Sequence, residues 1–97
     1  MTDMISLSNE SRVVVSKDQV SCDLAGEVAI LNLKNGVYYG LDPVGALIWN
    51  LIQAPTTFAE IRDALLDCYD VDKGRLESDI RELLDTLAEQ GLVEIHP

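Results

Sequence analysis

Residues 27–43 read EVAILNLKNGVYYGLDP, and this stretch decides the fold. Two apolar runs flank the dipeptide Asn35-Gly36, and Asp42-Pro43 follows the second run. Asn-Gly between apolar runs is the strongest short signal of a β-hairpin, because both central residues of a type I′ turn need a positive φ. Asp-Pro is typical of a helix start, with the aspartate as N-cap and proline in the first turn. The stretch therefore predicts two antiparallel strands that lead directly into a helix.

A second turn candidate, Ala25-Gly26, extends the hairpin to a meander of three strands over Val20–Leu24, Glu27–Leu33 and Val37–Leu41. If both turns are two-residue loops, Leu33 lies opposite Tyr38, and alternation sorts the side chains onto two faces. One face holds Val20, Cys22, Leu24, Ala29, Leu31, Leu33 and Tyr38, and we predict it to be core. The other holds Ser21, Asp23, Val28, Ile30, Asn32, Val37, Tyr39 and Leu41, and we predict it to be partly solvated.

The strand at Val37–Leu41 lies at an edge of this meander. Edge strands expose unpaired N–H and C=O groups and are normally protected by lysine, proline or a bulge. This strand contains neither lysine nor proline. We therefore expect another element of the chain, or another chain, to cover it.

Helical periodicity governs the second half of the chain. After Asp42-Pro43, apolar residues recur at helical spacing as far as Ile52, and Pro55 ends the run. Thr57 and Glu60 form a capping box for a second helix, and Asp72 caps a third that Gly91 closes. The predicted buried stripes are Val44, Leu47, Ile48, Leu51 and Ile52; Phe58, Ile61, Ala64, Leu65, Cys68 and Tyr69; and Leu76, Ile80, Leu83, Leu84 and Leu87. Trp49 is expected at the flank of the core, or alternatively at the rim of a groove for a partner.

A short strand is also predicted at Arg12–Val15, and Leu92–Ile95 is expected to be a last short strand or an extended tail. The fold class is thus α+β and winged-helix-like, with a three-stranded antiparallel β-meander followed by three α-helices. The domain boundaries are a flexible N-terminal lead-in over 1–11 and a single domain over 12–97. A chain of 97 residues is large enough for one modest core.

Composition limits the partners. Seven Lys and Arg against seventeen Asp and Glu give a net charge of −10, which argues against nucleic acid. The third helix, which would be the recognition helix of a winged-helix protein, carries three basic and five acidic residues. No apolar run approaches the roughly 18 residues of a membrane span, and the N-terminus does not resemble a signal peptide. We expect a cytoplasmic protein that binds neither DNA nor membranes.

Catalytic and metal-binding residues are scarce. Cys22 and Cys68 lie far apart and are expected to be buried thiols, and the single histidine, His96, is next to the end. No Cys/His spacing fits a metal site. We therefore expect no catalytic residue, no metal, no cofactor and no enzymatic activity.

A family pattern runs through the middle of the chain. Glu27–Leu33, then Gly36-x-Tyr38-Tyr39-x-Leu41-Asp42 and Gly45-Ala46-x-Ile48-Trp49-x-Leu51, is similar to the PqqD-like family. This family is the recognition element of ribosomally made, post-translationally modified peptides (RiPPs). The chain is most similar to its stand-alone members from lasso-peptide gene clusters, in outline from Val20 to Ile95. The resemblance implies a non-catalytic protein that binds the leader segment of a precursor peptide and presents it to processing enzymes.

In this family the leader adds a strand to the edge of the third strand, beside the third helix. By placement, the implied leader-binding residues are Val37, Tyr38, Tyr39, Gly40 and Leu41 on the strand, and Leu76, Asp79, Ile80 and Leu83 on the helix. Gly40 either leaves room for a leader side chain or relieves packing against Leu31. The acidic helix face either attracts leader lysines or is simply solvated.

The implied partners are a precursor peptide, a cysteine leader peptidase and a macrolactam-forming cyclase. Radical-enzyme and quinone-cofactor pathways also use such proteins. The alternatives are a winged-helix DNA-binding regulator and a structural adaptor, and the edge strand also allows a homodimer through Val37–Leu41.

Overall fold

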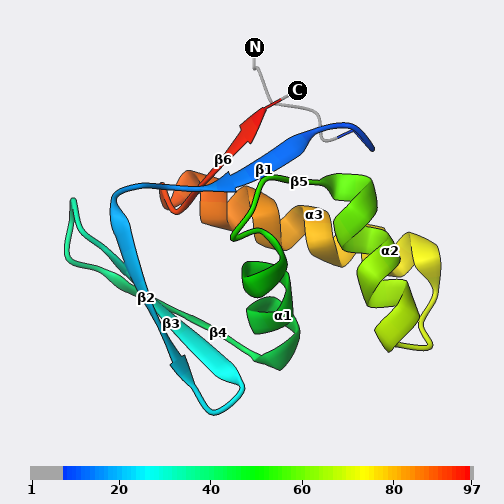
Figure 1. Ribbon diagram of the computed structural model, residues 1–97, viewed down its shortest axis with the longest axis horizontal. Coiled ribbons are helices and arrows are strands. Elements are labelled where there is room, and N and C mark those ends of the chain that lie inside the picture. The colour runs from blue at the N-terminus through cyan, green and yellow to red at the C-terminus, as the bar shows by residue number, and fades with distance from the viewer. Residues whose placement is uncertain (1–7, 97) are drawn as a thin grey trace.

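The computed structural model of the chain describes residues 8–96. Over these residues the chain forms two three-stranded antiparallel sheets and three helices, which confirms the α+β class and the meander followed by helices (Figure 1). The elements are β1 (Arg12–Val15), β2 (Gln19–Leu24), β3 (Glu27–Asn32), β4 (Tyr38–Leu41), α1 (Pro43–Leu51), β5 (Thr56–Thr57), α2 (Phe58–Cys68), α3 (Lys73–Glu89) and β6 (Val93–His96). No helix among the described residues is long and apolar enough to cross a membrane.

The two predicted short strands pair with each other. β1 lies between β5 and β6, with Val13 opposite both Thr56 and Ile95. Just before β1, the carbonyl oxygen of Ser11 accepts a hydrogen bond from the N–H of Phe58 at 2.9 Å. Residues 1–7 of the predicted lead-in lie outside the described residues. β1 and β6, which lie far apart in the sequence, thus pair in one small sheet over the helices (Figure 1).

The first turn of the meander is as predicted. Cys22 pairs with Ala29, and the two-residue loop has positive φ at Ala25 (57°) and Gly26 (94°). Both angles fit a type I′ turn.

The register at the second turn was predicted wrongly by two residues. Leu31, not Leu33, lies opposite Tyr38, because residues 33–36 form a four-residue loop. Two asparagine side chains stabilise the longer loop: Asn32 Oδ1 accepts from the N–H of Lys34 at 2.8 Å, and Asn35 Oδ1 from that of Val37 at 2.9 Å. A shift of two residues leaves each side chain on its predicted face.

The choice of the core face was wrong. Val28, Ile30 and Leu41 are buried and Asn32 is 7% exposed, although this face was expected to be partly solvated. On the face predicted to be core, Val20 and Leu24 are each 55% exposed and Tyr38 is 70% exposed. The reason is the direction of the chain after β4: Leu41 leads at once into α1, and α1 packs against β3 on the Leu41 side.

The helix caps are as predicted. Asp42 accepts from the N–H of Gly45 at 2.8 Å, Thr57 and Glu60 form the capping box, and Asp72 accepts from the N–H of Arg75 at 2.9 Å. Gly91, at φ 73°, follows the end of α3. These local signals fix where each helix begins and ends.

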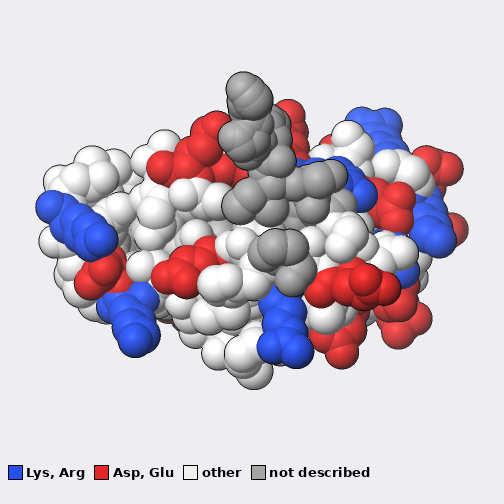
Figure 2. Space-filling view, turned by 90° about the horizontal axis from the view of Figure 1, so that it is seen from above, with Lys and Arg blue, Asp and Glu red and all other residues white. Residues whose placement is uncertain are grey.

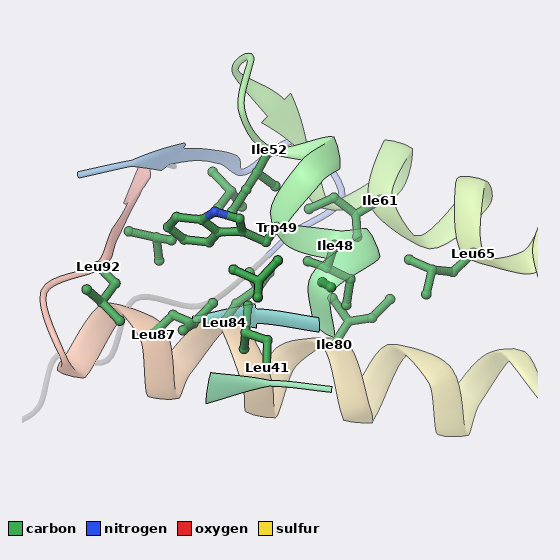
Figure 3. Packing of buried hydrophobic residues seen from close by; sticks show 14 of the residues in the cluster. Leu41, Ile48, Trp49, Ile52, Ile61, Leu65, Ile80, Leu84, Leu87 and Leu92 are labelled. Atoms are coloured by element: carbon green, nitrogen blue, oxygen red, sulfur yellow. The ribbon is translucent and has the colours of Figure 1, made fainter. Parts of the chain in front are cut away.

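Side chains from all three helices and both sheets share one core. Trp49, predicted at its flank, lies within it at 1% exposure, among side chains of α1 and α3 and near Leu92 (Figure 3). The buried apolar stripes of α1 and α2 are narrower than predicted, because Val44 on α1 and Cys68 and Tyr69 at the end of α2 are exposed. The cysteine prediction was also wrong: Cys22 lies on the uncovered sheet face and Cys68 ends α2, so both thiols are exposed.

Candidate functional site

A cavity of about 530 Å³ opens beside β4, between this strand, α3 and the first turns of α1. Its lining is mostly apolar. The lining residues are Tyr39, Gly40, Leu41 and Asp42 from the strand and its end, Val44, Gly45 and Ile48 from α1, and Leu76, Asp79, Ile80 and Leu83 from α3. We call it the β4–α3 groove.

One wall of the groove is an open strand edge. The sheet order is β2-β3-β4, so β4 pairs with β3 alone. The N–H of Asn32 donates to the carbonyl oxygen of Val37 at 2.9 Å, and hydrogen-bonded and non-bonded pairs alternate along an antiparallel ladder. Counting from that bond, Tyr39 and Leu41 direct their N–H and C=O groups toward β3. Tyr38 and Gly40 therefore direct theirs outward, toward any strand that approaches the edge.

Apolar residues of α3 form the opposite wall. Leu76 and Ile80 are 8% and 1% exposed, so they line the groove and belong to the core at once. Asp79 is exposed on the same helix. It lines the groove together with Asp42, so two carboxylates accompany an otherwise apolar surface.

The first turn of α1 closes one end of the groove, and Gly45 makes this possible. A Cβ at Gly45 would lie 3.2 Å from the Cβ of Leu41 and 3.3 Å from Oδ1 of Asp42. The missing side chain therefore lets the helix start tightly against the end of β4 while Asp42 caps it.

The predicted site residues are largely brought together. Tyr39, Gly40, Leu41, Leu76, Asp79, Ile80 and Leu83 all line the groove. Val37 and Tyr38 do not: Val37 precedes β4, and the side chain of Tyr38 lies on the other face of the sheet, although its backbone groups point outward at the edge.

The residues of α1 were missed. Asp42, Val44, Gly45 and Ile48 line the groove, but the sequence analysis treated them as helix cap and core. The signal was present, because a strand that ends at Leu41 and a helix that starts at Pro43 leave no room for a loop. The first turn of the helix must then lie beside the end of the strand.

This arrangement suits an extended peptide better than a reacting small molecule. A peptide strand can pair with Tyr38 and Gly40 while alternate side chains enter the apolar groove, and carboxylates favour basic groups nearby. Among residues 8–96, no three His, Cys, Asp or Glu side chains lie together in a way that could hold a metal ion.

Comparisons with known proteins agree with this geometry. The family model of coenzyme PQQ synthesis protein D (PqqD) matches residues 27–93. Among solved structures, TbiB1 in complex with the TbiA(beta) leader peptide is similar at 40% identity and a TM-score of 0.80, over 84% of this chain and 94% of that one. A lasso peptide synthetase B1 complexed with its leader peptide shares the fold at 22% identity and a TM-score of 0.76, over 84% and 96%. No curated protein matches the sequence.

Proposed function

Because this chain belongs to the PqqD family, we propose that it binds the leader segment of a ribosomally made precursor peptide. The leader adds a strand to the edge of β4 and lies in the β4–α3 groove. The protein acts without catalysis, in the cytoplasm where the precursor is made, and presents the bound precursor to a leader peptidase and a macrolactam-forming cyclase of a lasso-peptide pathway.

One observation carries this proposal: the open edge of β4 forms a wall of an apolar groove. Backbone pairing at Tyr38 and Gly40 supplies affinity that tolerates changes of leader sequence. The apolar pockets between β4 and α3 supply the selection of side chains. The 40% identical relative was solved with a leader peptide, which supports a ligand of the same kind here.

The charge of the chain agrees with a peptide ligand. A net charge of −10 and the exposed Asp79 favour a neutral or basic leader. The same charge disfavours a DNA duplex, because α3 carries more acidic than basic residues.

Fluorescence anisotropy with a labelled leader peptide, taken from the precursor encoded beside this chain, tests the proposal. A scrambled leader and a DNA duplex are the controls. We expect saturable binding of the leader alone. Binding of the duplex, or no binding of the leader by folded protein, would contradict the proposal. Sedimentation of the free protein shows whether it forms a dimer, which is the alternative use of the β4 edge.

A further inference from the structure

Gly40 lies on the open edge of β4, and the fold does not require a glycine there. Its φ is not positive, and a Cβ added to it would meet no atom within 4 Å. The expectation that Gly40 relieves packing against Leu31 is therefore wrong; its partner across the ladder is Ala29. A glycine within a strand weakens it, because it has no side chain to pack and loses more conformational entropy on folding than any other residue. Folding alone thus does not explain Gly40.

The missing side chain leaves space on the face of the sheet that lies away from the β4–α3 groove. Side chains alternate along a strand, so the Cβ position of Gly40 shares a face with Tyr38, whereas Leu41 points into the core. Val20, Leu24 and Tyr38 on this face are each more than half exposed, so no described element covers it. We call this uncovered side of the β2–β3–β4 sheet the outer face.

Strand addition does not by itself call for a glycine at this place. A bound strand pairs with β4 in the plane of the sheet, about 4.8 Å away, while side chains stand roughly perpendicular to that plane. The outward N–H and C=O groups at position 40 can therefore pair equally well if any residue but proline stands there. What Gly40 changes is the layer of side chains on the outer face.

A side chain of the bound leader can occupy the space above Gly40. Residues directly opposite each other in a sheet share a face, with Cβ atoms about 5 Å apart. We call the leader residue opposite Gly40 the facing residue. A large side chain at the facing position can extend across β4 and lie over the bare backbone of Gly40. Ala29, the next residue in this row, is short and leaves the path open, and Tyr38 borders it two residues along β4.

The surroundings of this space are uncharged. The neighbours of Gly40 on the outer face are Ala29, Leu31 and Tyr38. Alternation along β2, β3 and β4 brings one charged residue to the outer face, Glu27, at its corner. Figure 2 shows charged groups crowded at the α2 end of the molecule and fewer at the end that carries these strands. Such a surface favours an apolar side chain over a charged one, which would lose hydration without gaining a partner.

We propose that Gly40 selects a leader with a large apolar side chain at the facing position, which lies over the backbone of Gly40 beside Tyr38. This inference rests on the proposed function and deepens it. The bound strand is then apolar on both of its faces at this point: one side chain enters the β4–α3 groove, and the next lies across the outer face. A large side chain over an edge glycine also fixes the register of the leader on β4.

Peptide variants at the facing position test the selection. Nuclear Overhauser effects between backbone protons of Gly40 and of the bound leader peptide identify the facing residue. Alanine, leucine and phenylalanine are then placed there in turn, and the affinity of each labelled peptide is measured by anisotropy. On the protein, Gly40→Ser fills the space with a small polar side chain. Cys22→Ser is the matched control, since Cys22 lies in the same row but on β2, two strands away from the β4 edge.

We expect the wild-type protein to bind the leucine and phenylalanine peptides about fivefold more tightly than the alanine peptide. The phenylalanine ring should also shift the α-proton resonances of Gly40 upfield. Gly40→Ser should remove most of the preference, because a large apolar side chain over the hydroxyl would exclude water from it. Thermal unfolding of this variant should be unchanged or raised, since the space is open in the free protein. Cys22→Ser should keep the full preference.

Equal affinity of the wild-type protein for the three peptides would overturn selection by Gly40 and leave the proposed function intact. The same conclusion follows if Gly40→Ser keeps the full preference, or if it weakens the binding of all three peptides equally. A leader peptide that does not bind the folded wild-type protein would overturn both the selection and the proposed function.

Discussion

The side-chain Nδ2 of Asn32 donates a hydrogen bond to the carbonyl oxygen of Gln90 at 2.7 Å, across 58 positions of sequence. Asn32 ends β3, and Gln90 is the C-cap of α3. Because β4 pairs with β3, this bond ties one wall of the β4–α3 groove to the other. The same side chain accepts from the N–H of Lys34 through Oδ1, so Asn32 also shapes the loop before β4.

Replacing Asn32, which is 7% exposed, by alanine removes both hydrogen bonds, one to the backbone of Lys34 and one to that of Gln90. We expect a loss of about 1–3 kcal/mol in the free energy of unfolding. Leader affinity should also fall, because the hydrogen bond that helps to hold β4 and α3 in their relative positions is lost. Urea unfolding followed by Trp49 fluorescence measures the first effect. Asn50→Ala, at an exposed position of α1, is the control and should change neither quantity; equal stability of the two variants would contradict the assignment.

Tyr38→Pro removes an N–H that points away from β3 and therefore should abolish leader binding while the sheet survives. Tyr39→Pro removes an N–H directed toward β3 and should destabilise the fold. Ser21→Pro is the matched control: Leu33 N–H donates to the carbonyl oxygen of Asp18 at 2.9 Å, and alternation from that bond directs the N–H of Ser21 outward from β2. Circular dichroism and anisotropy distinguish the three variants. Strand addition to β4 would be wrong if Tyr38→Pro bound the leader as well as Ser21→Pro does.

Gly45→Ala should lower both stability and leader affinity. Its Cβ would lie 3.2 Å from the Cβ of Leu41, which cannot rotate away, and overpacking of this kind costs about 1–3 kcal/mol. Gly74→Ala, also in the first turn of a helix capped by aspartate, meets the capping carboxylate of Asp72 at 3.3 Å, as Gly45→Ala meets that of Asp42, but has no contact like that with Leu41. It should be neutral or stabilising, since alanine is the better helix former. Thermal unfolding of both variants checks the opposite signs, and a stabilised Gly45→Ala would refute the packing argument.

Asp79→Lys reverses a charge in the groove without removing apolar contact area. For a leader that carries basic residues, we expect severalfold weaker binding and a smaller dependence on salt. Asp85→Lys makes the same change on α3 at an exposed position that does not line the groove, so it controls for net charge. Anisotropy titrations at low and high salt make the comparison. Identical losses of leader affinity in both variants would show that the net charge of the protein, and not the position of Asp79, causes the effect.

Local signals were sufficient to predict the three helices and five of the six strands that the described residues form; the two-residue strand β5 was not predicted. Turn chemistry at Ala25-Gly26, the cap at Asp42 and the capping box at Thr57 act within a few residues, so they can be read from sequence. The second hairpin was misread because Asn32 and Asn35 stabilise a longer loop through side-chain bonds. The Asn-Gly dipeptide alone does not show whether a two-residue or a four-residue loop forms.

The buried face could not be predicted from the strands themselves. Apolar residues are more numerous on the face that holds Val20, Leu24 and Tyr38, yet the helices cover the opposite face. Burial depends on where α1 packs, which is a long-range property. The apolar excess that misled the prediction therefore lies on the uncovered face of the sheet.

Most residues that line the groove were predicted by placing β4 beside α3. That placement came from the family resemblance and not from the helical periodicity of the sequence. Val37 was predicted to belong to this strand, but it precedes β4 and does not line the groove. The contribution of Gly45 depends on distances below 3.5 Å, which no sequence pattern gives.

Amide hydrogen exchange, followed residue by residue by NMR with and without the leader peptide, tests strand addition most directly. The N–H groups of Tyr39 and Leu41 face β3 and should be protected in both states. Those of Tyr38 and Gly40 should exchange rapidly in the free protein and become protected when the leader binds. Leader binding that leaves Tyr38 and Gly40 unprotected would contradict the account.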